Sequence, residues 1–311
     1  MPLFRRGDGE AAKAAAAEQQ ASIEQLLRGG LPAKAEARLR DTAGGPFTTD
    51  LSVNEFALAV PTGVRPVTQV MGSSVYHVGW QRTPGGWSWQ AGSQELTVVS
   101  DAWNEARRLA FGRLAREAEL AGAHAVVGLQ LTTGSHDWVA DAVEFLAFGT
   151  AVRVDGDEPD VPVLTDLSLQ EYWQLRRAGY RPAGLHGSTG VFYVVSSWSQ
   201  QRAQSGWGSW ANQELRDFTQ GLYDAREVTI GRVTQQARAA RADGLVGVSL
   251  SYDIREVEIE SGGGRRTDLM VTMHALGTAI VQHEPIREAP PRLSVDLSAG
   301  GGNNHLLGGM R

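Results

Sequence analysis

The side chains best suited to metal chemistry in this 311-residue chain are its histidines and carboxylates. Soft heavy metals prefer thiolate ligands, and the chain contains no cysteine. No two histidines stand four positions apart or form a His-x-His pair, the spacings that bring two imidazoles to one metal ion. They are His77, His124, His136, His186, His274, His283 and His305. We therefore predict no metal site; the alternative left open is a site shared with carboxylates across a subunit interface.

No spacing of nucleophile, base and acid points to catalysis. The chain has no Gly-x-Ser-x-Gly turn, no P-loop and no Gly-x-Gly-x-x-Gly after a strand. Two carboxylate pairs occur at matched positions, Asp50 with Asp166 and Glu55 with Glu171. Each glutamate follows a serine by three residues, which is the spacing of a capping box, and we attribute all four carboxylates to helix capping. We predict neither an enzyme nor a bound cofactor.

Six of the nine tryptophans lie in two segments rich in glycine and serine, which predict loops. Large amphipathic rings are enriched at protein interfaces and in stacking sites. We predict that these six residues form a binding or interface surface. The rings either cover the sheets and fill contacts between subunits, or bind a partner protein or a planar ligand. They are Trp80, Trp87, Trp89, Trp198, Trp207 and Trp210.

The composition is that of a soluble globular protein, with 42% hydrophobic and 21% charged residues. The formal net charge of -6 provides no basic field for nucleic acid or an anionic membrane. The first residues include two arginines with no apolar run after them, so they predict no signal peptide. No stretch approaches the roughly 18 apolar residues of a membrane span. We expect a cytoplasmic protein that binds neither nucleic acid nor membrane.

One block of sequence occurs twice. It reads Ala-Gly-Ala-His-Ala-Val-Val-Gly-Leu-Gln-Leu at residues 121–131 and Ala-Arg-Ala-Asp-Gly-Leu-Val-Gly-Val-Ser-Leu at residues 240–250. A long amphipathic helical pattern precedes each copy, at residues 94–121 and 213–240. Inside the block, valine and leucine alternate with small or polar residues, which predicts a half-buried strand. The duplication predicts two copies of one folding unit.

Two further strands complete each predicted unit. The first, at residues 66–80 and 182–198, is interrupted by glycine and serine, which predict a bulge or bend near residues 72–74 and 187–190. The last strand is apolar on both faces, which is typical of a central or interface strand. It covers residues 143–154 in one copy and 269–281 in the other. A sheet of so few strands has edges that need covering by the other copy or by another chain.

These patterns predict an α+β fold: two tandem copies of a small antiparallel sheet covered by one long helix, with an N-terminal helical extension. The chain would then divide into five parts. They are a helical and flexible arm at residues 1–46, a first domain at 47–154, a linker at 155–163, a second domain at 164–283 and a disordered tail rich in glycine and proline at 284–311.

The duplicated motifs together resemble the YbjQ-like family (UPF0145), which carries the label "putative heavy-metal-binding". The resemblance covers residues 48–154 and 164–282. It implies small α+β domains that form rings, typically pentamers. Two domains on one chain depart from that pattern, and five chains would supply ten units as two stacked rings. The motifs are the duplicated block, Gly149-Thr-Ala-Val152 with Gly277-Thr-Ala-Ile280, and Ala106-Arg107 with Ala225-Arg226.

From these observations we predict a non-catalytic scaffold or binding protein that assembles into a homo-oligomeric ring. The N-terminal arm and the C-terminal tail are candidate contacts for a protein partner. The alternative is a ring that sequesters a small molecule or a metal ion.

Overall fold

The computed structural model describes residues 6–41, 45–79, 92–135, 142–156, 159–197, 212–261 and 264–284. Helices and strands occur in two similar series, in residues 45–154 and 163–284, which we call the first half and the second half. The first half contains α3 (Val53–Ala59), η1 (Val60–Thr62), β1 (Val64–His77), β2 (Gln94–Glu95), α4 (Thr97–Leu120), β3 (Ala125–Ser135) and β4 (Ala142–Val154). The second half contains β5 (Val163–Leu164), α5 (Leu169–Arg177), β6 (Tyr180–Val194), α7 (Arg216–Ala239), β7 (Gly244–Ser261) and β8 (Gly264–Gln282).

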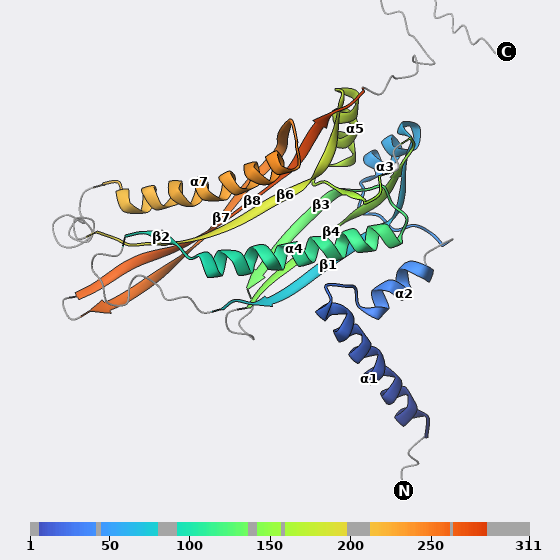
Figure 1. The fold of residues 1–311 in the computed structure, drawn as a ribbon, viewed down its shortest axis with the longest axis horizontal. Helices are drawn as coiled ribbons and strands as arrows, with labels where there is room; N and C mark the ends of the chain where they lie inside the picture. The colour runs from blue at the N-terminus through green and yellow to red at the C-terminus, as the bar shows by residue number, and fades with distance from the viewer. Residues whose placement is uncertain are drawn as a thin grey trace, which may run out of the picture.

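Each half forms a sheet with one long helix across it (Figure 1). The strand orders are β1-β4-β3-β5 and β2-β6-β8-β7, and helices α4 and α7 pack on the first and second sheet. The apolar strands β4 and β8 are central, as predicted, and the α+β fold with two sheet-and-helix copies is confirmed. The short strand β5 pairs with β3 in parallel, so the first sheet is not wholly antiparallel.

Both predicted capping boxes form, but the aspartates do not act as caps. Ser168 and Glu171 exchange their hydrogen bonds at the start of α5, and the matched serine and glutamate do so before α3. Asp166 instead accepts a hydrogen bond from the hydroxyl of Thr278, at 2.5 Å, and Asp50 accepts one from Thr150. The attribution of these aspartates to capping was therefore wrong. They join the start of each half to the threonine of its Gly-Thr-Ala motif.

The predicted interruption of the first strand in each half was also wrong. β1 and β6 run without a register shift through Gly72 and Gly190, and their bulges lie earlier, at Pro66 and Pro182. A Cβ atom at Gly72 would overlap the backbone of α4, and one at Gly190 would lie 2.6 Å from the hydroxyl oxygen of a helix threonine. The glycines are there because each helix lies very close to its sheet.

The duplicated block forms β3 and β7, but not as a simple alternating strand. Each strand contains a bulge, between Val127 and Gln130 or between Val246 and Ser249. A glycine with positive φ lies inside each bulge, with φ of 61° in β3 and 64° in β7. The two long helices also begin later than predicted, at residues 97 and 216. In the first half the preceding residues 94–95 form strand β2 instead.

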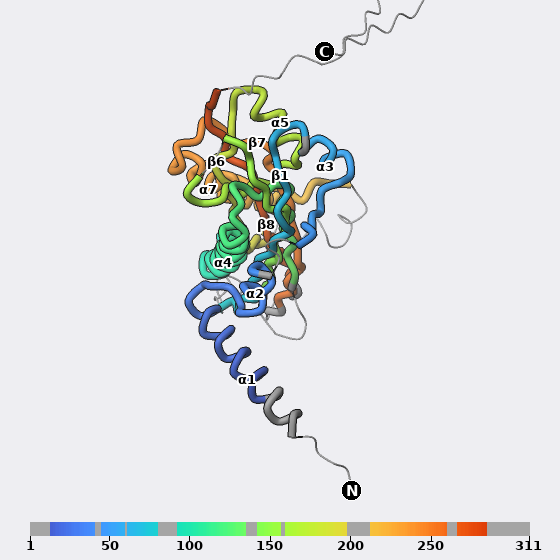
Figure 2. Tube along the Cα trace, turned by 90° about the vertical axis from the view of Figure 1, so that its right-hand side faces the viewer, coloured from blue at the N-terminus to red at the C-terminus, as the bar shows by residue number. Residues whose placement is uncertain are grey.

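The predicted N-terminal helical extension consists of α1 (Arg6–Leu27) and α2 (Ala33–Asp41). Helix α1 projects away from the sheets, while α2 lies against α4 (Figure 2). Arg38 of α2 forms an ion pair with the buried Glu117 of α4 at 2.7 Å, and Leu31 and Leu39 are buried. No helix among the described residues is long and apolar enough to cross a membrane.

Candidate functional site

The two halves meet along a seam in which each half adds a short strand to the other's sheet. Strand β2 of the first half pairs with β6 of the second, with Gln94 opposite Tyr193 and Glu95 opposite Phe192. The backbone N–H of Leu96 then donates to the carbonyl of Val191 at 2.7 Å. Edge strands expose unpaired backbone groups, so this pairing covers the outer edge of β6.

The second half returns a segment to the edge of β3. The N–H groups of Val163 and Thr165 donate to the carbonyls of His124 and Val126, each at 3.0 Å. At the bulge, the N–H of Gly128 donates to the carbonyl of Leu167 at 2.7 Å. The bulge thus provides a donor for the crossing segment. The predicted linker, residues 155–163, ends inside this pairing, and the predicted domain boundaries stay a prediction.

Arg107 of α4 is the central side chain of the seam and is only 6% exposed. Its Nη1 donates to Thr189 Oγ1 at 2.9 Å, and its Nη2 donates to the carbonyl of Gly187 at 2.7 Å and to Asn104 Oδ1. Asn104 also accepts from the N–H of Thr189 and donates to its carbonyl, each at 2.9 Å. Burial lowers the pKa of Arg107 to about 10, so it remains charged at neutral pH.

His274 of β8 lies beside this cluster and is held neutral. Its Nδ1 lies 2.9 Å from Thr189 Oγ1, and its ring lies 5.0 Å from that of Trp103. Burial, together with the charge of Arg107, lowers the pKa of His274 to about 4. The imidazole therefore contributes packing and one hydrogen bond rather than charge at pH 7.

An ion pair between the halves flanks the cluster. Arg232 of α7 binds Glu95 of β2 through both carboxylate oxygens, at 2.5 and 2.9 Å. Both side chains are substantially buried, and the two-pronged geometry fixes their orientation as well as adding energy. Glu95 belongs to the first half and Arg232 to the second, so this ion pair joins the two halves directly.

A cleft of about 1080 Å³ follows the seam between α4 and α7. Phe111, Leu164 and Leu185 form an apolar part of its lining, and both helices contribute polar side chains. The hydroxyl of Ser188 lines the cleft, is buried and has no hydrogen-bond partner among the described residues. The cleft has room for a small molecule or a side chain of another protein.

Apolar residues that are buried in the seam have counterparts in the other half that are exposed to solvent. Leu129 of β3 is 3% exposed, but Val248, at the same place in β7, is 45% exposed. Val191 of β6 is 1% exposed, but Val75, at the same place in β1, is 54% exposed. Each half therefore presents, at the surface, the counterpart of a face that is buried inside the chain. Other large apolar residues exposed on these two strands are Met71, Leu250, Tyr252 and Ile254.

The six tryptophans of the predicted interface surface, Trp80, Trp87, Trp89, Trp198, Trp207 and Trp210, all lie outside the described residues, so that assignment stays a prediction. His136 and His305 also lie outside them. Among the residues that the structure describes, no group of three or more histidines and carboxylates could hold a metal ion. His274 and His124 instead engage Thr189 Oγ1 and the backbone of Val154. This donor set does not fit a heavy-metal site.

The sequence did not identify the seam. Ala-Arg occurs at matched positions in both long helices, as Ala106-Arg107 and Ala225-Arg226. Arg107 is buried but Arg226 is exposed, so the shared dipeptide gives no signal for burial. Arg107 binds Thr189 and the carbonyl of Gly187, which come from the other half, and no local pattern could reveal them.

A family model described as "Putative heavy-metal-binding" (YbjQ_1) matches residues 89–155. The chain is 35% identical over 229 residues to "Encapsulin nanocompartment protein Rv1762c" of Mycobacterium tuberculosis, and this match covers 70% of this chain and 84% of that protein. It is 44% identical over 61 residues to "UPF0145 protein BH0643" of Halalkalibacterium halodurans, covering 20% of this chain and 56% of that protein. "UPF0145 protein CD630_17110" of Clostridioides difficile is 41% identical over 63 residues, with 20% and 54% covered. No solved structure matches the chain.

Proposed function

Because the chain belongs to the YbjQ-like family (UPF0145), we propose that it is a non-catalytic structural protein that assembles with its own copies into a closed ring in the cytoplasm. The relative from Mycobacterium tuberculosis is named as an encapsulin nanocompartment protein, and the others carry the family's name alone, so none of these names is an enzyme's. We propose that this chain serves as a scaffold in such a compartment.

The observation that carries the proposal is the contrast between β3 and β7. The same strand is covered in the first half and bare in the second, where Val248, Leu250 and Ile254 face solvent. Contiguous exposed apolar surface beside an open strand edge is typical of an interface. A chain whose function is self-assembly accounts for both features.

The resemblance to this family implies rings that are typically pentamers, and we propose five chains in the particle. Native mass spectrometry tests this: the expected species is five times the 33.5 kDa chain. A chain that stays monomeric across micromolar concentrations overturns the ring.

A protein partner would bind through the N-terminal arm or the C-terminal tail. The tail ends in His-Leu-Leu-Gly-Gly-Met-Arg at residues 305–311, an apolar segment after a glycine-rich run. Deleting residues 285–311 should leave the number of chains in the ring unchanged. It should abolish co-purification with the compartment. Retained co-purification would exclude the tail as the contact.

A second candidate function is sequestration of a small molecule, and the cleft between α4 and α7 favours it. The apolar part of its lining and the unpaired hydroxyl of Ser188 suit an amphipathic ligand. The measurement is native mass spectrometry of the gently purified ring, with elemental analysis for metal. A stoichiometric extra mass would favour sequestration, and a stoichiometric transition metal would contradict the donor-set argument given above.

A further inference from the structure

Two faces of the chain correspond to the two faces that meet in the seam. The front face comprises residues 213–215, helix α7 and the open edge of β7, and it matches the part of the first half that lies in the seam. The back face comprises residues 47–51, the open edge of β1 and Arg113, and it matches the part of the second half that lies in the seam. We propose that the front face of one chain binds the back face of the next in the register of the seam within the chain. This deepens the proposed function and rests on it.

The register follows from two constant offsets. Residues 94–131 correspond to 213–250, an offset of 119 (213 − 94), and residues 47–77 correspond to 163–193, an offset of 116 (163 − 47). The pairing of β2 with β6 therefore transfers to Gln213 opposite His77 and Glu214 opposite Tyr76 of the next chain. The N–H of Leu215 then donates to the carbonyl of Val75, as Leu96 does to Val191.

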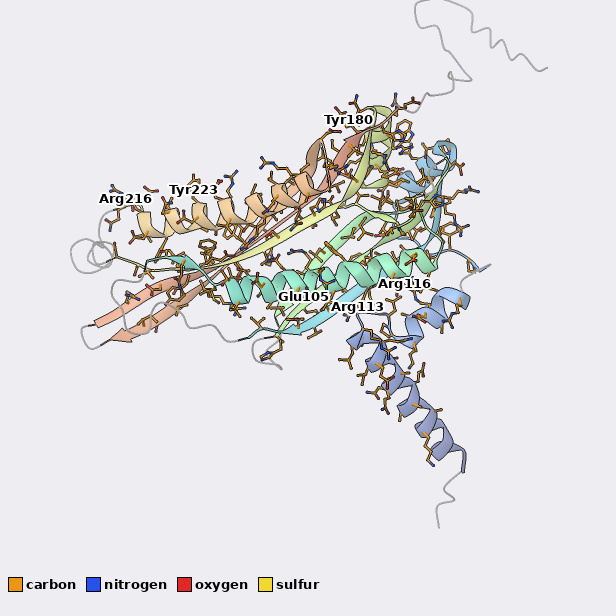
Figure 3. All side chains as sticks on the ribbon, viewed as in Figure 1. Glu105, Arg113, Arg116, Tyr180, Arg216 and Tyr223 are labelled. Carbon is orange, nitrogen blue, oxygen red and sulfur yellow. The ribbon has the colours of Figure 1, made fainter. Side chains whose placement is uncertain are left out.

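The helix that follows supplies the same acceptor in both places. In the seam, the N–H of Val191 donates to the hydroxyl of Ser100 at 2.9 Å. The matched residues are Val75 and Thr219, which also carries a hydroxyl. Tyr223, on the same face of α7 and 60% exposed, takes the place of Asn104 (Figure 3). The front face thus retains the hydroxyl acceptor and offers an aromatic ring to an apolar strand.

A charge pair transfers with the strands. Glu95 and Arg232 of the seam correspond to Glu214 and Arg113. Arg113 lies on α4 beside β1, where its Nη1 donates to the carbonyl of Ser73 at 2.5 Å and its Nε is buried with no hydrogen-bond partner among the described residues (Figure 3). Glu214 is exposed. A partly buried guanidinium without a carboxylate is costly, and the next chain would supply that carboxylate.

The same offsets also give the hydrogen-bond partners at the other edge of the interface. The crossing segment that pairs with β3 corresponds to residues 47–51, so the N–H groups of Phe47 and Thr49 would donate to the carbonyls of Asp243 and Leu245. The N–H of Gly247 would donate to the carbonyl of Leu51, as Gly128 donates to Leu167. This pairing closes the open edge of β7 and covers Val248.

Helix α2 gives the interface between chains a part that the seam lacks. Its Arg38 contacts Glu117 and the carbonyl of Gln69, and these positions correspond to Gln236 and Leu185 in the cleft. In the register above, α2 fills the cleft between α4 of its own chain and α7 of the neighbour. The cleft within each chain stays open, so the two kinds of contact alternate around the assembly.

Charge exchange tests the register in the full chain. Glu214→Arg and Arg113→Glu should each raise the concentration for half-assembly at least tenfold, and the double variant should restore most of the loss. The control is Arg108→Glu, which disturbs an exposed pair with Glu105 outside both faces and should leave assembly unchanged. Single variants that assemble like the parent overturn the register but leave the ring standing. A parent chain that is monomeric overturns both.

Cysteine pairs provide a second measurement that does not depend on the charge variants folding. The chain has no cysteine, so every disulfide must come from the introduced residues. His77→Cys and Gln213→Cys, on separate chains that are mixed and oxidised, should give a covalent dimer on a non-reducing gel. Val53→Cys, exposed on α3, replaces His77→Cys in the control and should give none. No dimer from the first pair in an assembled sample overturns the proposal.

Discussion

Strands β3 and β7 carry copies of one sequence block and share a bulge with a left-handed glycine. Yet residues 125–129 of β3 are mostly buried, whereas residues 247–256 of β7 are exposed. The difference arises from what lies beside each strand. β3 is covered by the crossing segment of the second half, and β7 has no such segment among the described residues. Burial of an edge strand is therefore a property of its neighbour, and an unmatched edge identifies where a neighbour is missing.

The largest effect that separates the two strands should come from a charge placed in each. Leu129→Asp buries a carboxylate without a partner in the core, and we expect a loss of more than about 3 kcal/mol in the free energy of unfolding. Val248→Asp, at the matched exposed position, should alter the stability of the single chain by less than about 0.5 kcal/mol. Urea denaturation at a concentration where chains are dissociated measures both.

The Val248→Asp variant also tests whether β7 is covered in the assembled state. Val248→Asp should prevent assembly although it leaves the single chain folded, because the carboxylate would lie under the crossing segment of the next chain. Analytical ultracentrifugation reports this directly. Normal assembly of the Val248→Asp variant would show that β7 stays bare, and the contrast with β3 would then have another cause.

The matched arginines should give the next largest difference. Arg107→Met removes the charged donor to the hydroxyl of Thr189 and one of two donors to the carbonyl of Gly187, which keeps its bond from Gln236. We expect a loss of about 2–3 kcal/mol in the free energy of unfolding. Arg226→Met removes an exposed side chain that pairs with its neighbour Glu227 and should have little effect on the dissociated chain. Denaturation curves of the two variants, side by side, test this. Equal losses would contradict a special role for the seam.

The smallest predicted difference concerns pH. The pKa of His274 is lowered from 6.5 to about 4 in the folded chain, so the unfolded chain binds its proton at higher pH. Stability is then lost as the pH falls from about 6.5 to about 4, by about 2 kcal/mol between pH 7 and pH 5. His274→Leu, which installs the leucine found at the matched position 146, should lose less over that interval. Parallel curves for parent and variant would exclude His274 as the source.

Local signals predicted the elements of this fold well. The capping boxes, the 3.6-residue periodicity of the long helices and the apolar character of β4 and β8 each depend on nearby residues. The duplication predicted two copies because every element recurs. These features depend on residues that are close together in the sequence, and not on which distant segment packs against them.

The seam could not be predicted because its partners are distant in sequence. Glu95 and Arg232 are 137 residues apart, and nothing near either one marks the other as its partner. Gly72 and Gly190 were interpreted as bulges because glycine in a strand has two uses, and only the packed helix shows that close approach is the one that applies. Asp50 and Asp166 were assigned to caps because the threonines that bind them lie about 100 residues away.

In a ring whose contacts between chains repeat the seam, the two halves of each chain are already neighbours, because β2 pairs with β6 and β5 pairs with β3. Whole chains add halves two at a time, so a ring of this kind contains an even number of halves. Five chains would then form one wide ring of ten halves, whereas two stacked rings of five would require each chain to part its own halves. The opening of such a ring would be wider than that of a relative built from five single units.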